Sequence, residues 1–203
     1  MIDDKEAKLE RIEEEVRALE QSPLYEYRVE NGYQPVIGEG DPDAEIMFIG
    51  EAPGAREAET GRPFVGRAGQ VLDDLLRSIG VDREDVYITN VVKDRPPDNR
   101  DPHVGEITLY SPFLLRQIQI IRPVVIATLG RFAVGFLLEK YDHPRQGETI
   151  GDLHGEVLEV DASYGELRIV PLYHPAAAFY NRQLEETMTE DVQVLKACLE
   201  SLS

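Results

Sequence analysis

Three short segments of this chain place polar side chains at the ends of apolar runs. Residues 50–54 (GEAPG) follow one run, Asn90 lies in the later half of a second, and His174 follows a third. The amide and the imidazole can hydrogen-bond a polar ligand, and the backbone N–H groups of the glycine-rich turn can bind an anion. In an open α/β sheet, ligands bind at the edge where such strands end. Convergence of three strands therefore predicts a ligand site at that edge.

Alternating strands and helices are expected to position these segments. Strands are predicted at residues 46–49, 86–92, 124–129, 156–160 and 167–172, and helices at residues 5–20, 66–79, 104–121, from 130 onward and 185–202. Residues 23–43 are expected to form loop and a short edge strand, and residues 95–102 and 144–151 to form loops. Because the strands are almost continuously apolar, they favour a parallel sheet covered on both faces.

The composition is that of one domain. A chain of 203 residues with 42% apolar composition can bury one core, so residues 1–203 are expected to form a single unit. Within it we expect an N-terminal helix at 1–21, a motif-bearing core at 22–182 and a C-terminal helix at 183–203. No run approaches the roughly 20 apolar residues of a membrane span. Cys198 is the only cysteine, which excludes internal disulfides. We expect a soluble, cytoplasmic protein.

The charge is strongly one-sided. The formal net charge is −18, and only five of the 21 basic residues are lysines. This pattern resembles proteins adapted to molar salt, where a carboxylate-rich surface stays hydrated and its self-repulsion is screened. A haloarchaeal source is expected, with an ordinary acidic protein as the alternative. Taken alone, the total charge argues against binding to DNA phosphates.

Four motifs carry a closer resemblance. Residues 50–57 (GEAPGARE), 60–69 (TGRPFVGRAG), 87–93 (YITNVVK) and 174–177 (HPAA) closely resemble the motifs of family 4 uracil-DNA glycosylases, in order and at the family's spacing. The resemblance runs from about residue 22 to about residue 181. It implies a three-layer αβα sandwich around a central, mostly parallel four-stranded sheet.

The resemblance implies a pocket for a uracil base taken out of the DNA stack. Phe64 is expected to stack on the base, and Asn90 to read it, because an amide carbonyl accepts from uracil N3–H and the amide N–H donates to O4. Cytosine presents the opposite pattern. His174 is expected to stabilise the negative charge that develops on the departing base, mostly at O2. The expected uracil-binding residues are Gly50, Glu51, Ala52, Phe64, Asn90 and His174.

The group that activates the attacking water stays open at this point. Other glycosylase families have an aspartate where this chain has Ala52, so Glu51 and Glu57 are the nearby acids. By resemblance Glu57 lines the pocket, where it either assists the water or excludes the thymine methyl group. The expected catalytic residues are His174, Glu57, Glu51 and Asn90.

Contacts with DNA are expected from the loops around these motifs. The predicted DNA-binding residues are Gly54, Arg62, Gly66, Arg67, Lys93, Arg95, Arg100, Phe179, Tyr180 and Arg182. Their basic side chains would make this edge positive although the molecule is not. Phe179 and Tyr180 would wedge into the gap left by the base. The family more often has leucine followed by arginine there.

One family feature is missing. By resemblance, family 4 enzymes hold a [4Fe-4S] cluster on four cysteines that staples the N-terminal segment to the Pro-rich loop. The corresponding positions here are Leu19, Ser22, Asp94 and Tyr110, none of which replaces a thiolate ligand. We predict that the chain holds no iron-sulfur cluster, no metal and no other cofactor, and that Leu19 and Tyr110 make a small apolar contact instead. Ala58 also replaces a common acid.

The function predicted is that of a uracil-DNA glycosylase that begins base excision repair of deaminated cytosine. Its partner would be uracil-containing DNA, single- or double-stranded, and it would act as a monomer. A cluster-free paralogue that binds DNA or another modified base without excising uracil is the alternative. A hydrolase of free nucleotides is a third interpretation. Asn90, His174 and Phe64 favour the enzyme, because a mere binder needs no donor to a leaving group.

Overall fold

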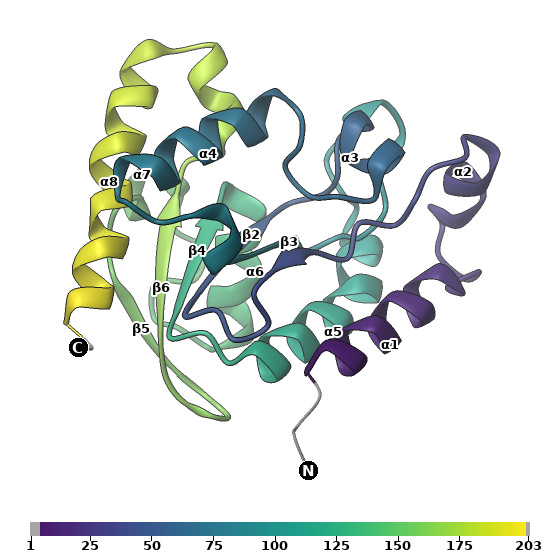
Figure 1. Ribbon diagram of the computed structural model, residues 1–203, viewed down its shortest axis with the longest axis horizontal. Coiled ribbons are helices and arrows are strands. Elements are labelled where there is room, and N and C mark those ends of the chain that lie inside the picture. Colours follow the sequence, from purple (N-terminus) through teal and green to yellow (C-terminus); the bar gives the residue numbers. More distant parts are fainter. Residues whose placement is uncertain (1–4, 202–203) are drawn as a thin grey trace.

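The computed structural model describes residues 5–201 (Figure 1). The helices are α1 (Lys5–Arg17), α2 (Tyr25–Glu30), α3 (Ala55–Thr60), α4 (Arg67–Ser78), α5 (Val104–Ile121), α6 (Arg131–Lys140), α7 (Ile150–Leu153) and α8 (Arg182–Glu200). The strands are β1 (Glu39–Gly40), β2 (Ile46–Gly50), β3 (Tyr87–Asn90), β4 (Val125–Leu129), β5 (Leu158–Ala162) and β6 (Gly165–Leu172). Three 3₁₀ turns join them: η1 (Arg83–Asp85), η2 (Pro97–Asn99) and η3 (Pro175–Phe179).

The strands form one mixed sheet in the order β1-β3-β2-β4-β6-β5. The four central strands are parallel, and β1 and β5 are antiparallel edges. The predicted, mostly parallel character of the sheet is confirmed, but the predicted count of four strands is wrong, because the described sheet has six. The two additional strands are edges. β1 pairs over only two residues, and β5 pairs with β6 as a hairpin.

Helices cover both faces of this sheet, as Figure 1 shows. On one face α4 and α8 pack against Ile46 and Phe48 of β2. On the other, α5 and α6 pack against Met47 and Ile49 of the same strand. Because all four side chains are at most 2% exposed, β2 is apolar throughout rather than alternating, which is the pattern of a central parallel strand.

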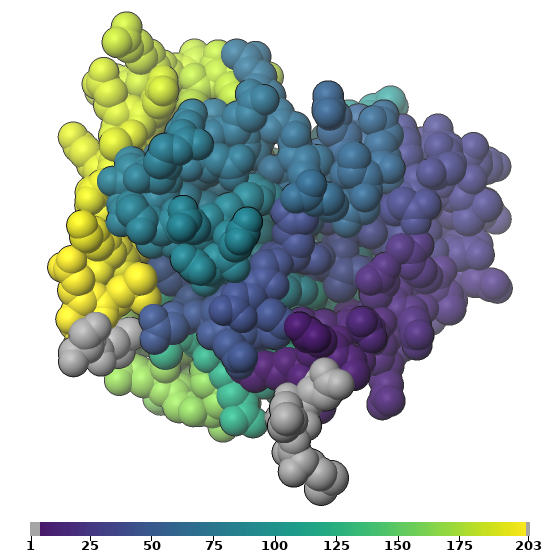
Figure 2. Space-filling view, in the orientation of Figure 1, coloured from purple at the N-terminus to yellow at the C-terminus, as the bar shows by residue number. Residues whose placement is uncertain are grey.

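The predicted helices match the observed ones best where the apolar period is long. Helix α5 begins and ends where predicted. Helices α2, α3 and α7 have four to six residues and lie in segments predicted as loop, because a single turn or two shows no periodicity. In the space-filling view, α1 and α2 (purple to violet) lie on the side opposite α8 (yellow) (Figure 2).

Helix α1 ends at Arg17, earlier than predicted. Helix α8 begins at Arg182, slightly before its predicted start, and ends at Glu200. The first four residues of the predicted N-terminal helix and the last two of the predicted C-terminal helix lie outside the described part. No helix within residues 5–201 is long and apolar enough to cross a membrane.

The register of the strands brings the predicted site residues to one edge. Gly50 at the end of β2 lies directly opposite Asn90 at the end of β3. Leu129 at the end of β4 lies opposite Leu172, two residues before His174. The parallel strands therefore deliver their polar residues to the same carboxyl edge.

Candidate active site

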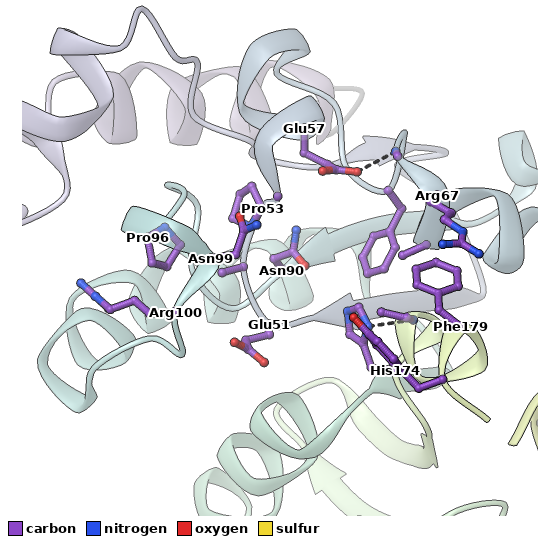
Figure 3. Close-up of a pocket in the computed structure, with 17 residues that line it drawn as sticks. Glu51, Pro53, Glu57, Arg67, Asn90, Pro96, Asn99, Arg100, His174 and Phe179 are labelled. Carbon is purple, nitrogen blue, oxygen red and sulfur yellow. Dashed lines mark hydrogen bonds between the residues drawn. The ribbon is translucent and has the colours of Figure 1, made fainter.

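A cavity of about 530 Å³ lies at this edge (Figure 3). That volume is in the usual range for small-ligand sites. Asn90 and Glu51 lie in the middle of the view, with Arg67 and Phe179 on one side and Arg100 on the other. The whole lining consists of Glu51, Ala52, Pro53, Gly54, Glu57, Phe64, Gly66, Arg67, Ala68, Asn90, Pro96, Asn99, Arg100, His174, Ala176, Phe179 and Tyr180.

Asn90 presents an unused hydrogen-bond acceptor to this cavity. Its side chain is 2% exposed, and its Oδ1 has no hydrogen-bond partner. A buried polar atom without a partner is costly, so such an atom in a pocket indicates that a ligand supplies the partner. Gly50 leaves the necessary room. A Cβ at Gly50 would lie 2.4 Å from Asn90 Oδ1 and 2.7 Å from Phe64 Cζ.

Phe64 forms a flat wall of the cavity and is held by its loop. The side chain is 6% exposed, and its ring lies 5.8 Å from the His174 ring at an interplanar angle of 34°. Its φ of 47° lies in the left-handed region, which costs free energy for a residue with a Cβ. Arg83 stabilises this loop by donating to the Pro63 carbonyl at 2.6 Å.

His174 caps η3 and is fixed in one tautomer. The Ala176 N–H donates to His174 Nδ1 at 3.2 Å, so in the neutral ring the hydrogen lies on Nε2. Burial lowers the pKa of His174 to about 4, against a smaller raising effect of Glu57. Near neutral pH the ring is therefore an uncharged donor through Nε2–H.

The two acids of the site have different surroundings. Glu57 is 8% exposed, and its Oε1 accepts from the N–H groups of Val65 at 3.0 Å and Gly66 at 2.8 Å. Burial, followed by the charge of Asp101, raises the pKa of Glu51 to about 7. Glu57 is thus bound to the loop that carries Phe64, whereas Glu51 is poised to exchange a proton near neutral pH.

The contact with Glu57 changes the expectation for Gly66. Gly66 is predicted to contact DNA, but in the structure its N–H donates to Glu57 Oε1. Gly54 lines the cavity at the start of α3, and a Cβ there would lie 2.7 Å from Glu57 Oε2. Both glycines therefore provide space around the Glu57 carboxylate.

The prediction that Lys93 contacts DNA is wrong. Lys93 is 0% exposed, and its Nζ donates to Thr89 Oγ1 at 2.7 Å, Asn90 O at 2.7 Å and Gln117 Oε1 at 2.5 Å. Burial lowers the pKa of Lys93 well below its ordinary value. The hydrogen bond to the Asn90 carbonyl lets Lys93 support the backbone of Asn90 from inside the core.

Two other predicted DNA contacts are paired with carboxylates. Arg62 Nε donates to Glu39 at 2.7 Å, and Arg100 Nη2 donates to Glu106 at 2.6 Å. Arg100 still lines the cavity, whereas Arg62 does not. Pairing reduces the positive charge that either side chain offers to DNA.

The remaining predicted contacts lie at the rim of the cavity or outside it. The guanidinium of Arg67 lies 4.1 Å from the centroid of the Phe179 ring, and Tyr180 beside it is 90% exposed. Arg182 is exposed at the first residue of α8. Arg95 contacts tyrosine hydroxyl groups beyond the cavity.

Comparison with known proteins places this site in a family. The family model for the uracil DNA glycosylase superfamily matches residues 37–201. The chain belongs to this superfamily. It is 44% identical over 194 residues to a type-4 uracil-DNA glycosylase of Saccharolobus solfataricus, covering 95% of this chain and 87% of the relative. Type-4 enzymes of Archaeoglobus fulgidus and Thermotoga maritima are 46% and 40% identical, covering 81% of both chains and 95% of both chains. The chain therefore belongs to the type-4 uracil-DNA glycosylases.

Several residues of this glycosylase site were not found from the sequence. Arg83 supports the Phe64 loop, and Gln117 accepts a hydrogen bond from Lys93. The charge of Asp101, which pairs with Arg131, helps to raise the pKa of Glu51. Arg83, Gln117 and Asp101 lie outside the four motifs, and each acts on a residue that is distant in the sequence. Asn99 lies in the Pro-rich segment beside Arg95 and Arg100, which is the one local signal that indicated it.

The four positions that hold cluster cysteines in the family do not fit a cluster here. Asp94 is 0% exposed and accepts from Tyr110 OH at 2.5 Å, and the Tyr110 hydroxyl is 2.7 Å from Ser22 Oγ. Arg28 Nη1 lies 3.0 Å from both oxygens of Asp94. No group of three or more His, Cys, Asp or Glu residues in the described part could hold a metal ion. A hydrogen-bonded ion pair therefore occupies this place.

The replacement differs from the predicted one. Leu19 and Tyr110 do belong to the same buried apolar cluster. The additional component is polar: Arg28 also donates to the carbonyls of Val16 at 3.1 Å and Arg17 at 2.6 Å. The N-terminal helices are thereby joined to the segment after β3, which is where the family's cluster acts by resemblance.

We expect Asp94→Asn to lower the free energy of unfolding by about 3–5 kcal/mol, because it leaves the Arg28 charge buried without a counter-charge. Urea unfolding measures this. Asp74→Asn is the matched control, since Asp74 pairs with Arg77 at the surface and should contribute at most about 1 kcal/mol. Equal effects of the two variants would contradict a structural role for the buried pair.

Proposed function

We propose that this glycosylase excises uracil from DNA with Asn90, Phe64 and His174 as the residues that recognise and release the base. The observation that carries the assignment is the unpartnered Oδ1 of Asn90, buried in a cavity beside an aromatic wall. Uracil N3–H supplies the missing donor, and the amide nitrogen of Asn90 donates to O4. Cytosine lacks a hydrogen at N3 and has an amino group at position 4, so it opposes both contacts.

His174 acts on the leaving group. As the bond between sugar C1′ and uracil N1 breaks, its electron pair passes to the base and negative charge develops at O2. The Nε2–H of neutral His174 donates to that oxygen, and a preorganised donor of this kind is most effective where charge develops. An uncharged ring also remains a donor throughout the neutral pH range, because its pKa is about 4.

Glu51 is the group that takes the proton of the attacking water. Water oxygen bonds to C1′, the C1′–N1 bond breaks, the water proton passes to Glu51, and the uracil anion takes a proton from solvent. Glu57 is less suited, since one of its oxygens is engaged by two backbone N–H groups. Its role is to hold the Phe64 loop in place.

DNA enters across the rim formed by Arg67, Phe179 and Tyr180, with Arg95, Arg100 and Arg182 nearby. We propose that the substrate is single- or double-stranded DNA, that a monomer acts in the cytoplasm without a metal or cluster, and that the three-layer αβα core forms one domain. The carboxylate excess supports a high-salt setting. Buried contacts such as those of Asn90 are screened by salt much less than phosphate contacts are.

The test is incubation of purified protein in molar KCl with an oligonucleotide that contains one uracil, followed by alkaline cleavage of abasic sites. Strand breaks at the uracil, and none with thymine at the same position, are expected. Protein that binds the oligonucleotide but leaves no abasic site would support the non-excising paralogue. Iron assay of the same preparation should give less than one iron per ten chains.

We expect kcat/KM to rise with pH and level off above about 7. The pKa of Glu51 is raised to about 7, so the carboxyl is protonated and unable to accept a proton below that pH, and ionised above it. His174 contributes no change there, because its pKa is about 4. The measurement is the pH profile of excision. Glu51→Gln should remove this rise, and a profile that keeps it would exclude Glu51 as the base.

A further inference from the structure

A group of aromatic and basic side chains, Tyr27, Tyr33 and Arg95, lies outside the cavity and takes no part in the chemical steps proposed above. Tyr27 of α2 and Tyr33 just after it are half-buried, and their rings are 5.9 Å apart in an edge-to-face arrangement. Neither tyrosine belongs to any of the three buried apolar clusters. Packing of the core therefore does not account for these rings.

Arg95 is held against this tyrosine pair. Its Nη1 donates to Tyr33 OH at 2.7 Å and to Tyr27 OH at 3.3 Å, and its guanidinium lies 5.3 Å from the centroid of the Tyr33 ring. No carboxylate pairs with Arg95 among the described residues, although acidic residues outnumber basic ones almost two to one. Arg62 and Arg100, two other basic residues of the predicted DNA-binding set, do have such partners.

This group adjoins the cavity through the Pro-rich segment. Arg95 Nε donates to Asn99 Oδ1 at 2.9 Å, and Asn99 lines the cavity together with Pro96. Asn99 has a φ of 51°, a left-handed conformation that asparagine tolerates better than most residues. Figure 3 shows Asn99 and Pro96 on the side of the cavity away from Arg67 and Phe179.

We propose that Tyr27, Tyr33 and Arg95 form a subsite for a nucleotide that flanks the uracil on the same strand. The inference rests on the proposed function, because it extends the DNA path from the uracil pocket. A tyrosine ring stacks on any base, and an arginine without a carboxylate partner attracts the phosphate beside it. Such a subsite recognises nucleic acid without regard to sequence.

The chemistry suits a chain of this composition. Attraction between phosphate and a basic surface falls steeply as salt rises. Stacking on an aromatic ring depends on contact rather than on long-range charge, so it persists in concentrated salt. A tyrosine pair beside one unpaired arginine thus strengthens binding where a broad basic surface is lacking.

The test compares uracil oligonucleotides shortened from the 5′ end or from the 3′ end. For the wild-type protein, removing the flanking nucleotides on one side of the uracil should raise KM about 10-fold with little change in kcat. The subsite binds a nucleotide on that side only, so any change in KM on shortening the other side should be the same in Tyr33→Ala as in the wild-type protein. Tyr33→Ala should show the raised KM with every substrate, so that its length dependence on that side disappears. Tyr33→Phe retains the ring and should therefore keep most of the length dependence of KM.

Val29→Ala is the matched control, because Val29 is 58% exposed on the same short helix and contacts none of the three residues by a hydrogen bond or ring contact. It should leave KM and its length dependence unchanged. A merely structural role for Tyr33 would lower kcat or stability equally with all substrates, and that result would overturn the subsite. A wild-type KM that is independent of flanking nucleotides on both sides would also overturn it.

The subsite and the proposed function can fail separately. Fluorescence anisotropy with thymine-containing oligonucleotides of the same lengths measures binding without excision. If the wild-type protein leaves uracil in place but binds the longer strands more tightly, and Tyr33→Ala abolishes that difference, the subsite stands while uracil excision does not. If the wild-type protein excises uracil but binds short and long strands equally well, the proposed function stands and the subsite does not.

Discussion

Asn90→Asp is expected to reduce uracil excision about 10³-fold at pH 8. An ionised carboxylate cannot donate to uracil O4, and its charge opposes the negative charge that develops on the departing base. It would also lie in a site where Asn90 is 2% exposed, so that little water is there to stabilise the charge. The measurement is single-turnover excision from a uracil oligonucleotide.

The same variant makes a second, pH-dependent test. A protonated carboxyl group has one donor and one acceptor and so restores the pattern that uracil needs. The ratio of variant to wild-type rate should therefore increase as the pH is lowered through the pKa of the new carboxyl group. Asn181→Asp is the matched control, since exposed Asn181 caps α8 by accepting from Gln183 N–H, which aspartate does equally well. A near-normal rate for Asn90→Asp at pH 8 would remove Asn90 from base recognition.

His174→Ala is expected to lower kcat by about 10²–10³ with a small effect on KM, because the lost hydrogen bond strengthens only as the base departs. His143→Ala, outside the cavity, controls for the general effect of losing an imidazole. Parallel losses in the two variants, or a KM effect that accounts for the whole loss, would contradict the role of His174. Thermal melting of both variants checks that the fold is retained.

The long helices and the central strands of this fold could be predicted, because their sequence patterns extend over enough residues to be recognised. The 18 residues of α5 carry a helical period over several turns, and the continuous apolar run of β2 indicates burial on both faces. The short helices α2 and α3 could not be predicted. They are stabilised by contacts from elsewhere, such as the hydrogen bond from Gln34 N–H to the Ala58 carbonyl, and not by their own six residues.

Lys93 illustrates the limit for the site. In the sequence it is one basic residue of a loop that resembles a DNA-binding motif, and its charge indicates exposure. The fold instead places it among Thr89, Gln117 and the Asn90 carbonyl. A buried amino group is stable only with acceptors around it, and whether distant segments supply those acceptors is a property of packing.

The missing cluster likewise separates what residue types show from what packing shows. The sequence shows that the cysteines are absent, which is a matter of residue type alone. It does not show that Arg28 of α2 reaches Asp94 and completes a chain through Tyr110 to Ser22. These three contacts join residues that are 16 to 88 positions apart in the sequence.

By itself, then, the sequence determined the chemical groups and the strands that end beside them: a glycine-rich turn, an asparagine, a histidine and an aromatic residue at one predicted edge. These follow from residue type and from apolar periodicity, which are local. Only the tertiary structure decided that Asn90 keeps an unpaired acceptor, that Glu57 accepts from two backbone N–H groups whereas the pKa of Glu51 is raised by burial, and that Arg95 contacts tyrosines. Hydrogen bonding and desolvation depend on which distant atoms are brought within about 3 Å, and the folded chain alone sets those distances.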